Sequence, residues 1–116
     1  MADCLFCKIA KKEISSETVW EDADVVVFKD MHPRAPVHLL LVPRLHIASA
    51  NEARKEHEPT LGKLFSAARL VAEQVGVHHS GYRLIVNTGP DGGQVIDHLH
   101  MHLLGGRKIG PKGEEM

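Results

Sequence analysis

The stretch DHLHMHLL, residues 97–104, places a histidine at every second position, with leucine or methionine between the histidines. Alternate residues of a β-strand share one face of a sheet, whereas residues two apart on a helix do not face each other. The pattern therefore predicts a strand. Its apolar side chains face a core, and His98, His100 and His102 share the opposite face.

The rest of the chain predicts a small α+β domain. Two strand-like runs flank a polar turn in residues 17–30, and apolar strands are expected at 37–43 and 82–87. Apolar residues recur at helical spacing from Pro59 to Val75, and a short helix is expected near the N-terminus. Together these patterns predict a five-stranded antiparallel sheet with one long and one short helix, in a single domain spanning residues 1–116.

Composition excludes several classes of protein. The net charge of −1 argues against bulk nucleic-acid binding, which needs a surplus of lysine and arginine. No apolar run is long enough to cross a membrane, and the first residues lack the apolar core of a signal peptide. We therefore expect a cytoplasmic protein with reduced cysteines.

The histidine face has three interpretations. The first is that the histidines are ordinary polar surface residues, although a polar strand face does not require histidine. A metal site is a second interpretation, but His98 and His102 are about 13 Å apart on an extended strand, so at most two of the three histidines could share one ion. The third is nucleophilic attack at phosphorus, which the glycine-rich loop at residues 87–94 favours because its amides could converge on an anion.

HLHMHLL also fits the alternating signature of the histidine-triad (HIT) superfamily. FCKIAKKEI, FKDMHPRAPVHLLLVP, GYRLIVNTGPDGGQ and HLLGGR resemble its Hint branch, the purine nucleoside phosphoramidases, and the resemblance runs from Cys4 to about Gly110. It implies a homodimeric hydrolase that needs no cofactor and cleaves the P–N bond of adenosine 5'-phosphoramidates. The reaction passes through a nucleotidyl-histidine intermediate and releases AMP. The alternative is a non-catalytic nucleotide-binding adaptor of the same fold.

The resemblance assigns roles to individual residues. His100 matches the nucleophile, and the main-chain carbonyl of His98 is expected to hold its Nδ1 proton. His102 is expected to bind a phosphate oxygen and to help protonate the leaving amine. His38 matches the fourth family histidine, which supports the triad from a neighbouring strand, and Asp30 matches the carboxylate that binds the ribose hydroxyls.

Two further groups of residues match the nucleotide-binding positions of the family. The residues expected to line the purine slot, which the pattern alone would place in the core, are Phe6, Ile9, Phe28 and Met31. The residues expected in the phosphate loop are Asn87, Gly93, Gln94 and Val95. Many relatives carry serine in place of Val95, so a hydroxyl contact is lost there, but a main-chain amide remains.

The C-x-x-C pair, Cys4 and Cys7, has three interpretations. Two small buried residues on a first helical turn would explain it without any ligand. A redox motif is disfavoured, because such motifs lie between a strand and a helix and not at a chain end. The resemblance implies the third, a structural zinc ion whose further ligands are His46 and His98. Such a closed Cys2His2 set would leave His100 free.

Overall fold

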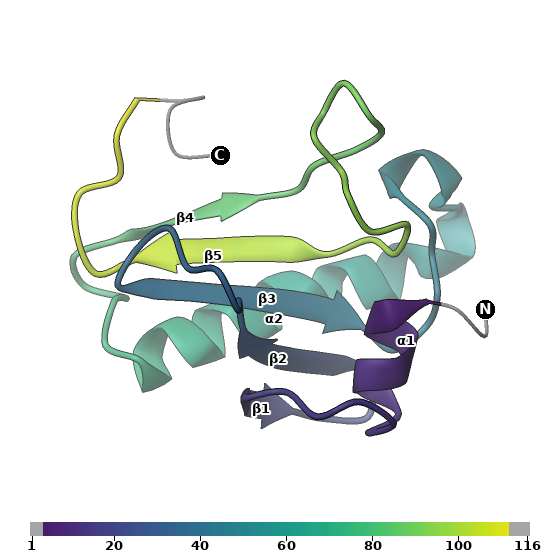
Figure 1. Ribbon diagram of the computed structural model, residues 1–116, viewed down its shortest axis with the longest axis horizontal. Helices are drawn as coiled ribbons and strands as arrows, with labels where there is room; N and C mark the ends of the chain where they lie inside the picture. Colours follow the sequence, from purple (N-terminus) through teal and green to yellow (C-terminus); the bar gives the residue numbers. More distant parts are fainter. Residues whose placement is uncertain (1–3, 112–116) are drawn as a thin grey trace.

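The structure is a computed structural model that describes residues 4–111. It contains a five-stranded antiparallel sheet with the order β1-β2-β3-β5-β4, which confirms the predicted fold class (Figure 1). The strands are β1 (Thr18–Glu21), β2 (Val25–Lys29), β3 (Val37–Pro43), β4 (Tyr82–Ile85) and β5 (Met101–Gly105). The helices are α1 (Leu5–Ala10) and α2 (Glu58–Gln74), with short 3-10 turns at Ala50–Glu52 and Lys55–His57.

The predicted domain extends over residues 1–116, of which 1–3 and 112–116 lie outside the described residues. Among the described residues, neither helix has the length and apolar character that a membrane span requires.

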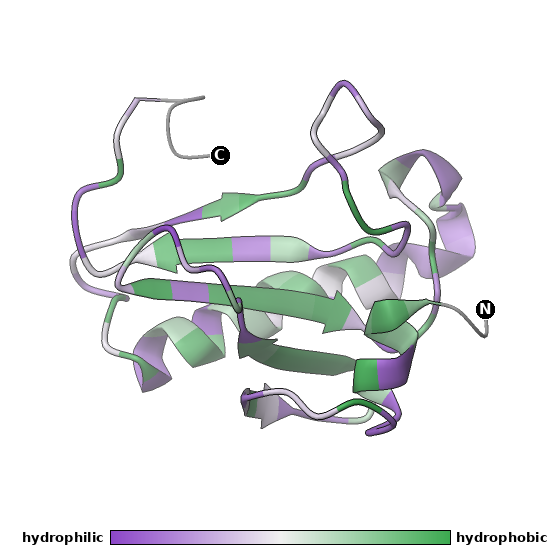
Figure 2. Ribbon diagram, in the orientation of Figure 1, coloured by the Kyte–Doolittle hydropathy of each residue, from purple (hydrophilic) through white to green (hydrophobic). Residues whose placement is uncertain are grey.

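The sheet has a helix on each of its faces. α2 covers one face and packs on side chains such as Val27, Leu41 and Leu103. α1 covers one end of the opposite face, where Phe6 and Ile9 pack against Phe28 and other buried residues. Figure 2 shows β3 as an almost continuous apolar ribbon between these layers. Its six residues from His38 to Pro43 are all buried, as expected for a central strand with both faces covered.

The histidine segment differs from its prediction in one respect. Only its last part is a strand, because β5 begins at Met101. His98 and His100 precede the strand: the amide of Leu99 donates to the carbonyl of Ile47 at 2.7 Å, so it pairs with an irregular segment and not with a neighbouring strand. The two-residue alternation is nevertheless kept, since Leu99 and Met101 lie in the core beneath α2.

Candidate active site

His100 has a defined tautomer. Its Nδ1 lies 2.7 Å from the main-chain oxygen of His98. A carbonyl oxygen can only accept, so Nδ1 carries the proton and the lone pair of the ring is on Nε2. Among residues 4–111 this Nε2 makes no hydrogen bond, and no buried side-chain nitrogen there lacks one. Nε2 therefore reaches solvent, which is the arrangement that a nucleophilic imidazole needs.

The carbonyl of His98 is itself held in place. It belongs to the same peptide unit as the amide of Leu99, which donates to the oxygen of Ile47 at 2.7 Å. The C=O and N–H of a trans peptide point in opposite directions. Fixing the amide on Ile47 therefore directs the carbonyl of His98 towards the ring of His100.

The surroundings of His100 keep it uncharged. The residue is 6% exposed, and burial lowers the pKa of its imidazole from the usual 6.5. The ring of Phe6, from α1, meets the ring of His100 in an edge-to-face contact with centroids 4.9 Å apart. A neutral ring keeps the Nε2 lone pair available for attack at neutral pH.

His38 and His102 form a second hydrogen-bonded unit beside the first. The amide of Arg34 donates to Nδ1 of His38 at 3.1 Å, so a neutral His38 carries its proton on Nε2. This Nε2 lies 3.0 Å from Nδ1 of His102 and 3.4 Å from Oδ2 of Asp30. His102 then accepts at Nδ1 and presents N–H at Nε2. Its ring centroid lies 5.1 Å from that of His100.

Burial also keeps this second unit neutral in the free protein. It lowers the pKa of His38 and, together with the positive charge that neighbouring His100 and His38 would carry, lowers the pKa of His102 to about 4. At neutral pH His102 is therefore a hydrogen-bond donor without a charge.

Asp30 follows β2 and lies at the edge of this unit. Its Oδ1 accepts from the amide of His32 at 2.8 Å, and its side chain is 20% exposed. Oδ2 thus has the His38 contact and room for a further donor. Contact with ribose stays a prediction.

The four residues expected to line the purine slot are not gathered in one place. Phe6, Ile9 and Phe28 are buried together beneath α1, as their apolar pattern alone would suggest. Met31, in contrast, is 87% exposed on the loop after β2. Of the buried three, Phe6 has the described contact with His100.

The glycine-rich loop differs from the expected anion site, because several of its amides are already hydrogen-bonded within the loop. The amides of Gly92 and Gln94 donate to Gly89, and the amide of Gly93 donates to Pro90, so these donors close the loop itself. The side chain of Gln94 is also committed to the loop. Its Oε1 accepts from the amide of Gly89, and its Nε2 donates to the carbonyls of Ala48 and Ile96.

Two residues complete the loop. Asn87 donates through Nδ2 to the carbonyl of Gly92 at 2.8 Å, so it too shapes the loop. The amide of Val95 has no main-chain acceptor among the described residues, and the residue is 87% exposed. Among the four predicted residues, Asn87 and Val95 therefore have main-chain amides that the loop itself does not use.

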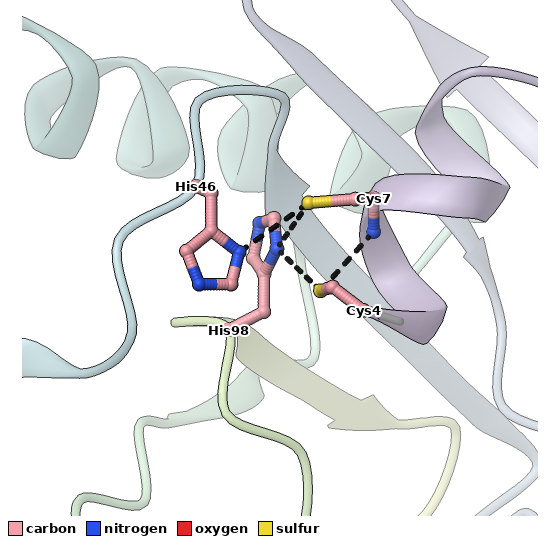
Figure 3. A group of neighbouring side chains, drawn as sticks. All are labelled: Cys4, Cys7, His46 and His98. Atoms are coloured by element: carbon pink, nitrogen blue, oxygen red, sulfur yellow. Dashed lines mark hydrogen bonds between the residues drawn. The ribbon is translucent and has the colours of Figure 1, made fainter. Parts of the chain in front are cut away.

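Cys4, Cys7, His46 and His98 converge beneath the start of α1 (Figure 3). Cys4 is the N-cap of α1, and its Sγ accepts from the amide of Cys7. One ring nitrogen of His98, Nδ1, lies 3.3 Å from Sγ of Cys4 and 3.5 Å from Sγ of Cys7. Nδ1 of His46 lies 3.3 Å from Sγ of Cys7. All four ligand atoms lie within 4.8 Å of one another.

The chemistry of this cluster fits a zinc ion. Sulfur and nitrogen ligands bound to one tetrahedral zinc ion lie about 3.5 Å apart, given bond lengths of about 2.3 and 2.0 Å. Nε2 of His98 donates to the carbonyl of Pro43 at 2.7 Å, so its Nδ1 lone pair faces the sulfur atoms. Burial lowers the pKa of His98 to about 4, which keeps the ring in the neutral, ligating form. Burial raises the pKa of the Cys7 thiol, so Cys7 stays protonated unless a cation replaces the proton.

His100 belongs to neither group of side chains that could share an ion. Within residues 4–111 those groups are the Cys4 cluster and the set of Asp30, His38 and His102. The structure thus resolves the histidine face into parts: His98 turns to the cysteines, His102 turns to His38, and His100 stands between them.

Sequence reasoning missed the main-chain groups that orient these rings. They are the carbonyls of Ile47 and Pro43 and the amide of Arg34. Nearly every residue type carries such groups, so no sequence pattern distinguishes them.

Comparisons with known proteins agree with this geometry. A family model described as HIT domain matches residues 11–109. Purine nucleoside phosphoramidase from Escherichia coli (strain K12) is 46% identical over 109 residues, which are 94% of this chain and 92% of that protein. The 14 kDa zinc-binding protein from Zea mays is 43% identical over 107 residues, covering 90% of this chain and 83% of that one.

Solved structures show the same relationship. The HIT family hydrolase from Clostridium thermocellum superimposes with a TM-score of 0.93 at 46% identity, with 97% of each chain covered.

Proposed function

This chain belongs to the HIT domain family and is a hydrolase of that family, and we propose that it cleaves the P–N bond of adenosine 5'-phosphoramidates and releases AMP. The observation that carries the proposal is the 2.7 Å contact between Nδ1 of His100 and the carbonyl of His98. A protein that only bound nucleotides, the alternative function, would not need an imidazole held in the tautomer of a nucleophile.

In the first step Nε2 of His100 attacks the α-phosphorus and forms a P–N bond as the bond to the amine breaks. The leaving nitrogen takes a proton from Nε2 of His102, because an amine leaves more easily than its anion. Nε2 of His102 already carries this proton in the free protein. The anionic phosphate raises the pKa of His102 above its value in the free protein, so that Nδ1 takes up a further proton when the substrate binds. When His102 is protonated, the Nε2–H of His38 can turn to Asp30, its second acceptor at 3.4 Å.

In the second step a water molecule attacks the phosphorus of the nucleotidyl-histidine. It gives one proton back to His102 and breaks the bond to His100, which releases AMP. The amide of Val95, which has no acceptor within the loop, is the donor that we assign to the phosphate, and Asp30 is assigned to the ribose hydroxyls.

The intermediate offers a direct test. The protein is mixed with an adenosine phosphoramidate and quenched in alkali. Intact-protein mass spectrometry should then show a nucleotidyl adduct. His100→Asn should show none, whereas the matched control His78→Asn, at an exposed position of the turn after α2, should form it. An adduct on His100→Asn would place the nucleophile elsewhere.

We also propose that Cys4, Cys7, His46 and His98 hold a structural zinc ion, on the strength of the ligand spacing and of the His98 tautomer. Bound there, zinc would cross-link α1 to the segment before β5. The nucleophile takes no part in this set, so we assign the ion no role in the chemistry at phosphorus.

Three accompanying expectations stay predictions. They are the preference for purine nucleotides, the homodimeric state and the cytoplasmic location.

A further inference from the structure

Arg107 reaches from the end of β5 to the loop between β2 and β3. Its Nη2 donates to the main-chain oxygen of Arg34 at 2.9 Å, and its Nη1 donates to the carbonyl of Lys108 at 3.0 Å. β5 carries His102, whereas the loop leads into His38 at the start of β3. The contact therefore ties together the two chain segments that carry the His38–His102 pair.

Gly106 makes this close approach feasible. Its φ is +91°, and a Cβ built there would lie 2.8 Å from Cβ of Pro36. Such a distance is shorter than real carbon atoms allow, so only glycine lets the chain pass against the loop at this point. The two consecutive residues Gly106 and Arg107 thus both contact the segment from Arg34 to Pro36.

The loop has few donors with which to fix itself. Pro33 and Pro36 have no amide hydrogen. The amide of His32 is used by Asp30 and the amide of Arg34 by Nδ1 of His38. Arg34 is therefore held through its N–H on the side of His38 and through its carbonyl on the side of Arg107.

We propose that Arg107 is a positioning residue for the hydrolytic reaction. By holding the carbonyl of Arg34, it keeps the amide of Arg34 on Nδ1 of His38, and so keeps the His38 proton on Nε2. The Nε2–H of His38 donates to Nδ1 of His102, so the proton of His102 stays on its Nε2. The inference rests on the proposed function, in which Nε2 of His102 supplies the leaving-group proton.

Loss of the clamp has a defined chemical consequence. Without the Arg34 amide, His38 can carry its proton on Nδ1 instead, and its Nε2 then accepts from Nδ1 of His102. In that tautomer His102 directs a lone pair, and not a proton, towards the substrate. The leaving amine then receives no proton from this ring.

The first test reads the tautomers directly in the free protein. Long-range ¹H–¹⁵N spectra of the wild type should show His38 and His102 protonated on Nε2. Arg107→Met, which keeps the aliphatic stem but no donor, should show a mixture at both rings, and Arg107→Lys should restore the wild-type pattern. The matched control is Arg69→Met, because Arg69 is an exposed arginine of α2 paired with Glu73. Unchanged tautomers in Arg107→Met would overturn the proposal.

The second test uses two leaving groups. With an alkylamine phosphoramidate of AMP, Arg107→Met should lower kcat about tenfold, the size of effect that a misplaced catalytic group produces. KM should stay within about twofold, since the nucleotide contacts are intact. With the p-nitrophenyl ester of AMP, whose nitrophenolate leaves without a proton, kcat should fall by less than about twofold.

Equal losses on both substrates, or the same loss in Arg69→Met, would show a general structural effect and overturn the inference. Its failure is separable from failure of the proposed function. A wild-type protein that turns over neither substrate would reject the proposed function, while the spectra would still report whether Arg107 sets the tautomers of His38 and His102.

Discussion

The backbone of His98 holds the nucleophile while its side chain faces away from it. The carbonyl oxygen of His98 accepts from Nδ1 of His100 at 2.7 Å, and the imidazole of His98 points to the two cysteines. One residue thus connects the proposed zinc site to the proposed catalytic centre. The two sites nevertheless use different atoms of it, so each can be perturbed separately.

Replacing the nucleophile should separate binding from turnover. His100→Asn should abolish hydrolysis while AMP affinity stays within about tenfold, because the change removes the attacking atom and leaves the pocket. Product formation and calorimetric titration with AMP measure the two effects. Hydrolysis close to the wild-type rate in this variant would contradict the assignment.

Asp30→Asn should weaken binding of AMP more than that of 2'-deoxy-AMP. Each ribose hydroxyl that donates to Asp30 loses a charged acceptor in this variant, which is worth about 1–3 kcal/mol. The deoxy ligand lacks the 2' hydroxyl, so its affinity should fall less. Dissociation constants for both ligands measure the difference. Asp24→Asn, in the β1–β2 turn beside Lys63, is the control and should leave both constants unchanged. Equal losses for both ligands in Asp30→Asn would mean that Asp30 does not contact the 2' position.

Metal content should follow the cysteines. Protein purified without chelator should carry about one zinc ion per chain, and Cys4→Ser should lose it. The melting temperature should fall with it, because an ion bound only by the folded chain adds its binding free energy to folding. Elemental analysis and calorimetry test both points. If the wild-type protein carries no metal and melts at the same temperature as Cys4→Ser, the cysteines are simple core residues.

Stability should decrease in mild acid partly because of His102. Burial lowers the pKa of His102 from 6.5 to about 4. Between these values the unfolded chain binds a proton that the folded chain does not, so the free energy of unfolding falls as the pH falls from about 6.5 to about 4. His102→Gln should reduce the loss between pH 7 and pH 5 by about 1–2 kcal/mol.

Urea unfolding at the two pH values measures this difference. The control His78→Gln, at an exposed histidine, should lose as much unfolding free energy as the wild type between pH 7 and pH 5. If His102→Gln also loses as much as the wild type, His102 is not buried in its neutral form.

Gly92 should be far less tolerant of alanine than Gly62. A Cβ on Gly92 would overlap the carbonyl oxygen of Thr88, whereas a Cβ on Gly62, within α2, meets nothing within 4 Å. Gly92→Ala should therefore destabilise by about 1–3 kcal/mol as the loop shifts. Gly62→Ala should stabilise by about 0.5–1 kcal/mol through helix propensity. Thermal unfolding compares the two, and a similar loss in both variants would contradict the loop geometry.

The sequence alone determined the features that depend on spacing along the chain. Alternation predicted the facing of residues 98–104, helical spacing predicted α2, and the dense apolar run at 37–43 predicted the central strand. The motifs then identified the family, because HLHMHLL fits its signature and the other stretches resemble it from Cys4 to about Gly110. Each of these inferences uses residue type, which the sequence states directly.

Only the tertiary structure decided which groups orient the histidines. The carbonyl of Pro43 and the amide of Arg34 contact histidine rings from distant parts of the chain. The carbonyl of Ile47 holds the Leu99 amide, and the guanidinium of Arg107 holds the Arg34 carbonyl, so these two act on the rings through the main chain. The same holds for the glycine loop, whose amides bond within the loop and not towards an open anion site. Main-chain donors and acceptors are identical in nearly every residue, so their partners are set by strand pairing and loop path in space, which residue type does not specify.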